Sequence, residues 1–165
     1  MRKKLLIFLV MTLLIVTNIF PLIGGTEQLD QEQDQYDSYQ DFYDEIWCSQ
    51  SFKPVYKKLT RVECYVYKTF NISSDLTLSI RKNQGGIDLT SKTISVDDIP
   101  TTPSWVDFNF TDIDVIDGDT YYILLRTNGG YDYAYYSWGY ADPSSYSNGS
   151  RTISWDGGTT WSAPD

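Results

Sequence analysis

From residue 46 onward, apolar and polar residues alternate in short runs that have the two-residue period of β-strands. In residues 59–70 (LTRVECYVYKTF), Val62 and Cys64 lie on one face of the predicted strand, and Glu63 and Tyr65 lie on the other. Similar runs occupy residues 46–52, 76–82, 89–96, 105–110, 119–127, 131–138 and the end of the chain. No segment of this region has the period of an amphipathic helix.

These runs predict an all-β fold over residues 46–165: an antiparallel jelly-roll β-sandwich of about eight or nine strands. The antiparallel wiring is expected because no crossover helix is available to join parallel strands. In residues 105–110 the pattern places Val106 and Phe108 inward and Trp105 outward. Residues 119–127 are mostly apolar, which is typical of a central strand.

The N-terminal segment has a different pattern. Arg2, Lys3 and Lys4 precede an apolar run from Leu5 to Val16, which predicts a secretory signal peptide over residues 1–25 or a retained N-terminal membrane anchor helix. Both alternatives place the rest of the chain outside the cytoplasm, in the extracellular space or at the cell surface. Residues 26–45 are rich in Gln, Asp and Tyr and poor in apolar residues, and they predict an acidic, flexible linker.

Charge and composition narrow the function. Without the three basic residues of the N-terminal segment, ten of the 13 basic residues remain against 22 acidic ones, a net charge of −12. Such a surface repels phosphate backbones, so nucleic acid is excluded as a partner. The chain has no His, and only Glu63 follows Glu45, so the usual catalytic bases and zinc ligands are missing. We therefore expect a protein that is not an enzyme.

Residues 154–161 (SWDGGTTW) resemble the Asp-box, a hairpin signature best known from sialidases and other carbohydrate-active propellers. Ser154, Asp156, Gly158 and Trp161 fill defining positions of the pattern. The carboxylate can accept backbone hydrogen bonds across the turn, the glycine allows positive φ, and the indole can cover the hairpin. We predict a structural role for this hairpin, because a single copy cannot build a propeller of several four-stranded blades.

A wider resemblance covers nearly all of residues 46–161. It is carried by the order of the segments QSF (50–52), LTRVECYVYK (59–68), LTLSIR (76–81), WVDFNF (105–110), DGDTYYILL (117–125), YYSWG (135–139) and SWDGGTTW. In this order the chain resembles the jelly-roll, galactose-binding-like and carbohydrate-binding-module-like domains of secreted and surface proteins. The resemblance implies a non-catalytic sandwich with a carbohydrate-binding or adhesive role, often with a structural calcium ion.

The aromatic stretch of residues 131–140 (YDYAYYSWGY) predicts a ligand surface. Tyr131, Tyr133 and Tyr135 share one face, and Tyr136, Trp138 and Tyr140 share the other, so one set faces the core and the other is exposed. Flat aromatic side chains beside polar loops stack well on sugars and on proteins. The predicted ligand-binding residues are Tyr136, Trp138, Tyr140, Asp142 and Tyr146. The alternative is that both aromatic sets are packing residues.

Three further features predict chemistry, each with a plainer alternative. Cys48 and Cys64 predict a disulfide in an oxidising compartment, against two buried free thiols. Four close carboxylates suit Ca²⁺, against an ordinary acidic surface; they are Asp112, Asp114, Asp117 and Asp119. Three N-glycosylation motifs begin at Asn71, Asn109 and Asn148.

Taken together, the sequence predicts a non-catalytic extracellular β-sandwich module at the cell surface, with a structural, adhesive or glycan-binding role. Its partner would be an extracellular glycan or a surface protein, and it would contact a membrane only through an N-terminal anchor. Ca²⁺ is the one cofactor that the residues suggest, and none is required. The alternatives are a glycan-specific, lectin-like module that acts for a separate enzyme and, less favoured, a glycoside hydrolase.

Overall fold

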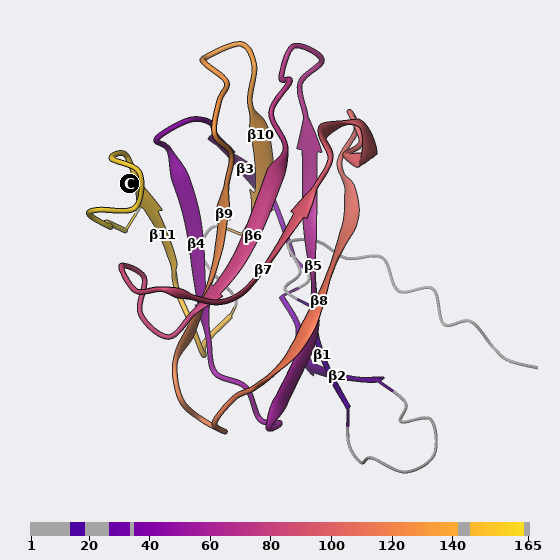
Figure 1. The fold of residues 1–165 in the computed structure, drawn as a ribbon, viewed down its shortest axis with the longest axis vertical. Helices are drawn as coiled ribbons and strands as arrows, with labels where there is room; N and C mark the ends of the chain where they lie inside the picture. The colour runs from indigo at the N-terminus through magenta and orange to yellow at the C-terminus, as the bar shows by residue number, and fades with distance from the viewer. Residues whose placement is uncertain (1–13, 19–26, 34, 142–145, 164–165) are drawn as a thin grey trace, which may run out of the picture.

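The computed structural model describes residues 14–18, 27–33, 35–141 and 146–163 (Figure 1). These residues form eleven strands and one short 3-10 helix, η1 (Val96–Asp98), and they include no α-helix. The strands make two antiparallel sheets that enclose one core, so the predicted all-β, sandwich-like architecture is confirmed. Eight of the strands lie in the region from residue 46 onward, in agreement with the predicted eight or nine.

The first sheet, called sheet A, is built around the longest strands, β5 (Lys58–Lys68) and β8 (Ser104–Asp114), which pair along most of their length. On its other edge, β5 pairs first with β1 and then with β10. The remaining strands of the sheet are β1 (Leu14–Asn18), β2 (Glu27–Gln31), β3 (Ser38–Phe42) and β10 (Tyr136–Tyr140). Strand β2 pairs with β1, and β3 pairs with β10, so β2 and β3 are edge strands.

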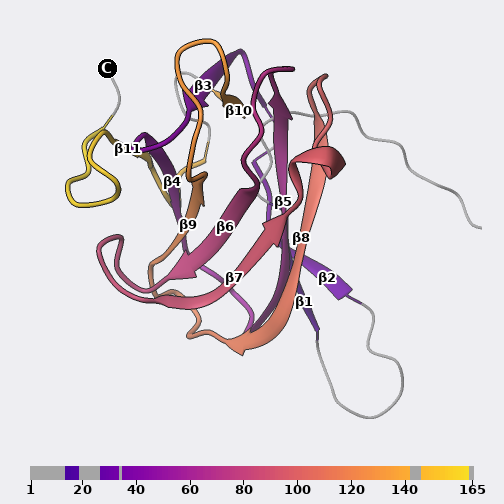
Figure 2. The same ribbon diagram turned by 45° about the horizontal axis from the view of Figure 1, so that its top comes forward.

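The second sheet, sheet B, has the order β11–β4–β9–β6–β7. Its strands are β4 (Trp47–Phe52), β6 (Leu76–Arg81), β7 (Asp88–Ile94), β9 (Tyr121–Arg126) and β11 (Arg151–Ser154). The mostly apolar run that the sequence placed in a central strand is β9, which pairs with β4 on one side and β6 on the other. In Figures 1 and 2 the β6–β7 connection bends across the outer face of this sheet.

The core consists of the inward-facing residues of both sheets. Val62, Cys64 and Phe108 come from sheet A, and Leu78 and Ile123 come from sheet B. On β5 and β8 these residues alternate with exposed or half-buried residues, as the two-residue period predicts. On β6 and β9 the outward-facing Ser79 and Leu124 are buried as well. Each fully buried aliphatic side chain contributes about 1.5–3 kcal/mol of hydrophobic stabilisation.

The domain begins earlier than the sequence predicts. Residues 38–42, assigned to a flexible linker, form β3, and Phe42 is fully buried in the core. Asp30 accepts hydrogen bonds from the backbone amides of Val55 (2.9 Å) and Tyr56 (3.1 Å), which ties β2 to the sandwich as well. The low apolar content of this segment misled the prediction, because an edge strand needs few apolar residues to anchor it.

The predicted N-terminal helix falls mainly on residues 1–13 and 19–26, which lie outside the described residues. The described part of that segment, Leu14–Asn18, is the strand β1 rather than a helix, and Val16 is opposite Arg61 of β5 in the register. Among the described residues, no helix has the length and apolar character needed to cross a bilayer.

Candidate ligand-binding face

The two outer faces of the sandwich differ in how far the protein itself covers them. On sheet B, Leu124 faces away from the core, yet its exposed fraction is 0%. The β6–β7 connection crosses this face, because Gln84 from the connection donates a hydrogen bond to the Thr152 hydroxyl of β11 at the far edge. The outer face of sheet B is therefore largely closed by the protein's own hairpin.

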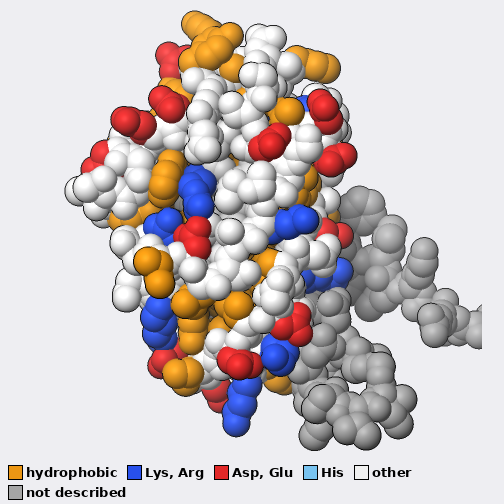
Figure 3. All heavy atoms as spheres, in the orientation of Figure 1, with side chains coloured by type: hydrophobic (Ala, Val, Ile, Leu, Met, Phe, Trp, Pro, Cys, Tyr) orange, Lys and Arg blue, Asp and Glu red, His pale blue; other side chains and the backbone are white. Residues whose placement is uncertain are grey.

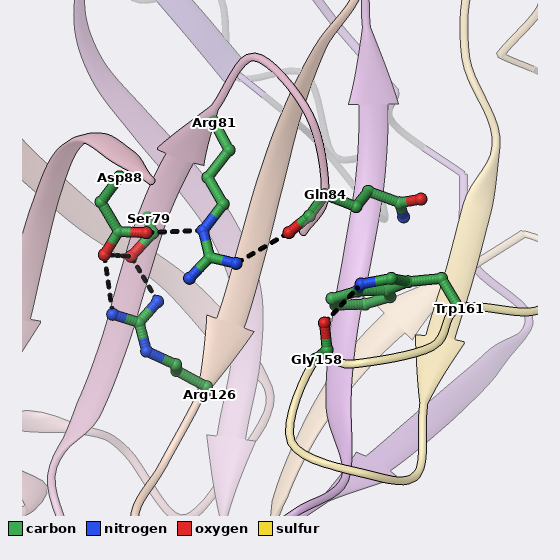
Figure 4. A network of polar contacts seen from close by, with 7 residues as sticks. All are labelled: Ser79, Arg81, Gln84, Asp88, Arg126, Gly158 and Trp161. Carbon is green, nitrogen blue, oxygen red and sulfur yellow. Dashed lines mark hydrogen bonds and ion pairs between the residues drawn. The ribbon is translucent and has the colours of Figure 1, made fainter. Parts of the chain in front are cut away.

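An ion-pair network beneath this hairpin holds it in place (Figure 4). Asp88 accepts hydrogen bonds from Arg81 Nε (2.6 Å), Arg126 Nη2 (2.8 Å) and the Ser79 hydroxyl (2.9 Å). Burial alone would raise the pKa of Asp88, but these three donors together hold it below its ordinary value. Both guanidinium groups also lie over the Trp47 ring: Arg81 is 5.8 Å and Arg126 is 5.3 Å from the ring centroid. The charges of Arg81, Arg126 and Asp88 are thus paired with one another within the protein.

The turn at residues 154–161 packs against the same face. The Asp156 carboxylate accepts hydrogen bonds from the Thr160 hydroxyl (2.7 Å), the Thr160 amide (2.8 Å) and the Ser154 hydroxyl (2.8 Å). These bonds lower the pKa of Asp156 to about 2. Gly158 has a φ of +86°, and the Trp161 indole donates to its carbonyl (3.1 Å; Figure 4). The polar side chains of the signature are used within the turn, as expected for a structural hairpin.

The outer face of sheet A is lined by aromatic rings instead. The Tyr65 ring lies 5.2 Å from the Trp105 ring and 5.1 Å from the Tyr36 ring, measured between centroids. Tyr39 extends the row, 5.4 Å from Tyr36 and 5.3 Å from Tyr67. The tyrosines are half-buried, and Trp105 is 37% exposed. We call these five side chains, together with Gly139 between them, the aromatic face.

Gly139 explains how the rings come together. It lies in β10, opposite Tyr39 in the register, and it carries no side chain that would separate the neighbouring strands' rings. A Cβ atom at this position would lie 3.3 Å from Cδ1 of Tyr65 and 3.4 Å from Cε1 of Tyr39, closer than most Cβ contacts. The two rings can therefore lean over the glycine from both sides, which makes the glycine the floor of the aromatic face.

Polar groups border the rings. The Ser137 hydroxyl donates to Asp41 (2.5 Å), and burial raises the pKa of Asp41 in spite of this bond. Burial also raises the pKa values of Tyr39 and Tyr65, so their hydroxyls stay protonated near neutral pH and can both donate and accept hydrogen bonds. Farther along β5, the Arg61 guanidinium forms an ion pair with the Glu63 carboxylate (2.8 Å). The face thus combines exposed ring surface with hydroxyl and carboxylate groups.

The predicted ligand-binding residues are mainly core residues. Tyr136 is 0% and Trp138 is 2% exposed, and Tyr146 is buried as well. Tyr140 is half-buried beneath the guanidinium of Arg151, which lies 3.5 Å from its ring centroid. Asp142 lies outside the described residues. The strand predicted over residues 131–138 begins only at Tyr136, because residues 131–135 form a turn. Along β10 the large aromatic side chains face inward, so a ligand cannot reach the most buried rings.

The sequence contained part of the signal for the aromatic face. The alternation already placed Tyr65 and Trp105 on outward positions, and their pairing across β5 and β8 is seen only in the structure. Tyr36 and Tyr39 were missed because they lie in the segment that was predicted to be a linker. A further group of exposed aromatic residues, Phe70 among them, lies on connections between strands.

Cys48 and Cys64 are both buried in the core as free thiols, so the predicted disulfide is not present. Cys48 lies in β4 of sheet B, whereas Cys64 lies in β5 of sheet A, and burial raises the pKa of each thiol. The asparagines of the three glycosylation motifs, Asn71, Asn109 and Asn148, are all exposed, and their modification stays a prediction. Asn109 lies on β8, opposite Arg61.

The four aspartates proposed as calcium ligands do not gather into one site. Asp114 pairs with Lys58 (3.3 Å), and Asp119 pairs with Lys82 (2.6 Å). Asp112 is exposed on β8, and Asp117 is exposed on the connection between β8 and β9. Within the described part of the chain, no three carboxylate or thiol groups lie close enough to hold a metal ion together.

The chain was compared with protein-family models, with curated proteins and with solved structures, and none of the three comparisons found a match.

Proposed function

We propose that this protein is an exported, non-catalytic module with jelly-roll wiring that binds carbohydrate through the aromatic face of sheet A. The observation that carries the proposal is the cluster of five aromatic rings on the outer face of sheet A, in which Tyr39 and Tyr65 meet over Gly139. A soluble domain gains nothing in stability from leaving aromatic surface in water, so an exposed aromatic group of this kind usually marks a contact site.

The chemistry of the face suits sugars. The flat, apolar sides of pyranose rings stack on aromatic rings, while tyrosine hydroxyls and carboxylates can bond the sugar hydroxyls. The Tyr65 and Trp105 rings are inclined by 47° to each other, and Tyr36 and Tyr39 by 55°. Rings that do not share a plane fit the changing orientation of sugar units along a single chain better than the flat surface of a crystalline polymer.

The second candidate is a structural or adhesive surface protein. Phe70, Tyr131 and Tyr133 are exposed on the β5–β6 and β9–β10 connections, and these connections lie side by side because Thr69 bonds Tyr135. These connections lie at the top of Figure 1, and Figure 3, in the same orientation, shows hydrophobic side chains there. Such an end could associate with another surface protein or with a second copy of the chain. The aromatic face of sheet A is the stronger site because its rings contact one another and border polar groups.

The full chain should be tested for binding on a glycan array, and the affinity of each hit should be measured by titration calorimetry. We expect Trp105→Ala and Tyr65→Ala each to weaken binding by up to about tenfold, since one stacked ring is worth up to about 1.4 kcal/mol. The matched controls are Trp155→Ala and Tyr133→Ala, at exposed aromatic residues away from the face. Absence of any glycan binding, or equal losses in the controls, would contradict the proposal.

A further inference from the structure

The charges around the aromatic face are predominantly negative. The outward positions of β3, β5, β8 and β10 beside the rings carry three carboxylates, those of Asp41, Glu63 and Asp107. Among the described residues at these positions, Arg61 is the only basic one. Its guanidinium lies 2.8 Å from the Glu63 carboxylate and 3.5 Å from that of Asp107. The one cation of the face is therefore held between two anions and does not present its charge to an acidic ligand.

Asp41 is placed to meet a ligand. It lies on edge strand β3, where neighbouring groups cover part of its carboxylate and the rest is open to solvent. It accepts a hydrogen bond from Ser137, and in the described chain it forms no salt bridge. In the register, Ser137 is opposite both Asp41 and Tyr67, so Asp41 belongs to the row of the sheet next to the one that contains Gly139. Neighbouring rows on one face are about 6.6 Å apart, so a group stacked on Tyr39 or Tyr65 has Asp41 within reach.

The rings act in the same direction as the carboxylates. Aromatic rings carry negative charge on their faces and attract cations that lie over them. Four of the five rings here are tyrosines, and each half-buried ring leaves part of its surface open. A protonated amine on a sugar stacked on this face would be attracted by both the rings and Asp41. A carboxylate on the same sugar would be repelled by both.

We propose that the aromatic face selects glycans that carry free amino groups, that is, cationic amino-sugar chains, over neutral and carboxylated glycans. This inference rests on the proposed carbohydrate-binding function and adds the charge of the ligand. It also gives a role to the acidity of the region around Gly139, which stacking on neutral sugars does not require.

The test compares three oligosaccharides of equal length: a glucosamine hexamer, an N-acetylglucosamine hexamer and a galacturonate hexamer. Binding to the full chain is measured by titration calorimetry at about pH 5.5 and about pH 6.5, in low salt and in high salt. The higher pH is included because burial raises the pKa of Asp41, so its negative charge is more complete there. We expect the glucosamine hexamer to bind about fivefold or more tightly than its N-acetylated counterpart, the size of effect that one partly screened ion pair supports. The preference should shrink in high salt, and the galacturonate hexamer should not bind.

Two substitutions separate selection at this face from general attraction to an acidic protein. Asp41→Asn keeps the size of the side chain and removes its charge, so it should reduce the preference for glucosamine about threefold and leave N-acetylglucosamine binding unchanged. The control is Asp117→Asn, at an exposed aspartate on the β8–β9 connection, which should change neither.

The possible results discriminate between the two proposals. If the N-acetylated hexamer binds as tightly as the amino hexamer and Trp105→Ala abolishes both, carbohydrate binding stands and the charge preference is wrong. If Asp117→Asn weakens glucosamine binding as much as Asp41→Asn does, the attraction is not specific to the face and the charge preference is again wrong. If no hexamer and no glycan on the array binds, both proposals fail.

Discussion

Two tryptophans on opposite faces of sheet A provide the sharpest test of this arrangement. Trp138 is 2% exposed and packs in the core, whereas Trp105 is 37% exposed and belongs to the aromatic face. Replacing a buried Trp by Ala costs about 3–5 kcal/mol, because the lost apolar contacts are joined by the cost of the cavity. Trp105→Ala removes a partly exposed ring and one ring contact, which is worth about 1 kcal/mol. We therefore expect Trp138→Ala to be destabilising and Trp105→Ala to be mild.

A third variant adds precision, because the Trp138 indole Nε1 is buried without a hydrogen-bond partner. An unpaired buried donor costs about 1–3 kcal/mol, so Trp138→Phe removes this cost while it loses part of the ring. We expect Trp138→Phe to stay within about 1.5 kcal/mol of the wild type, far from the Ala variant.

The assay is urea unfolding of all three variants, followed by circular dichroism and fitted for the free energy and the m-value. In a thermal scan, Trp138→Ala should lower Tm by roughly 10 °C or more, since 1 kcal/mol corresponds to about 3 °C at this chain length. If Trp138→Ala and Trp105→Ala cost the same within about 1 kcal/mol, the assignment of the two faces is wrong. The same holds if Trp138→Ala leaves stability unchanged but abolishes glycan binding.

Three further predictions concern the rest of the molecule. The low pKa of Asp156, about 2 against an ordinary 3.8, stabilises the fold above pH 4, and this contribution is lost as the pH falls toward 2. Asp156→Asn should therefore show a flatter dependence of Tm on pH in that window, and parallel profiles would contradict it. Cys48 and Cys64 should react with a thiol reagent only after unfolding, and a gain in intact mass on reduction would show that they are bridged after all. A Cβ atom at Gly149 would lie 1.8 Å from the Ser51 carbonyl oxygen, so Gly149→Ala should cost about 1–3 kcal/mol in urea unfolding, and a wild-type midpoint would refute this close approach.

The strands that the sequence predicted best are those that bury one face. In β5 and β8, the alternation of apolar and polar residues follows directly from burying one side of a strand, so local pattern and final structure agree. The strand at residues 38–42 was not predicted, because this edge strand is held in place by its pairing with β10 and by one buried residue, Phe42. Pairing between distant segments leaves no mark on the local composition.

The same reason explains why the aromatic face was only partly predicted. Alternation in residues 131–140 predicted two aromatic sets on opposite faces of one strand, but only residues 136–140 form β10, and Tyr131 and Tyr133 lie on the turn before it. The strand that pairs with β10 shows which side is buried: Tyr136 stacks on Phe42 of the neighbouring strand β3, 5.9 Å between ring centroids, within the core. The predicted ligand-binding residues Tyr136 and Trp138 belong to this inward-facing set, whereas the rings of the aromatic face come from other strands.

By itself, the sequence determined the strand-rich character of the chain, its acidity, the lack of His and the turn at residues 154–161, because these depend on composition or on neighbours within a few residues. Only the tertiary structure decided which aromatic rings meet. Trp105, Tyr65 and Tyr39 lie on β8, β5 and β3, and they come together because β5 pairs with β8 and β10, while β10 pairs with β3 and places Gly139 between them. Tertiary packing also closed the other face, where the β6–β7 hairpin covers sheet B. An aromatic surface of this kind is a property of strand order, which no local pattern encodes.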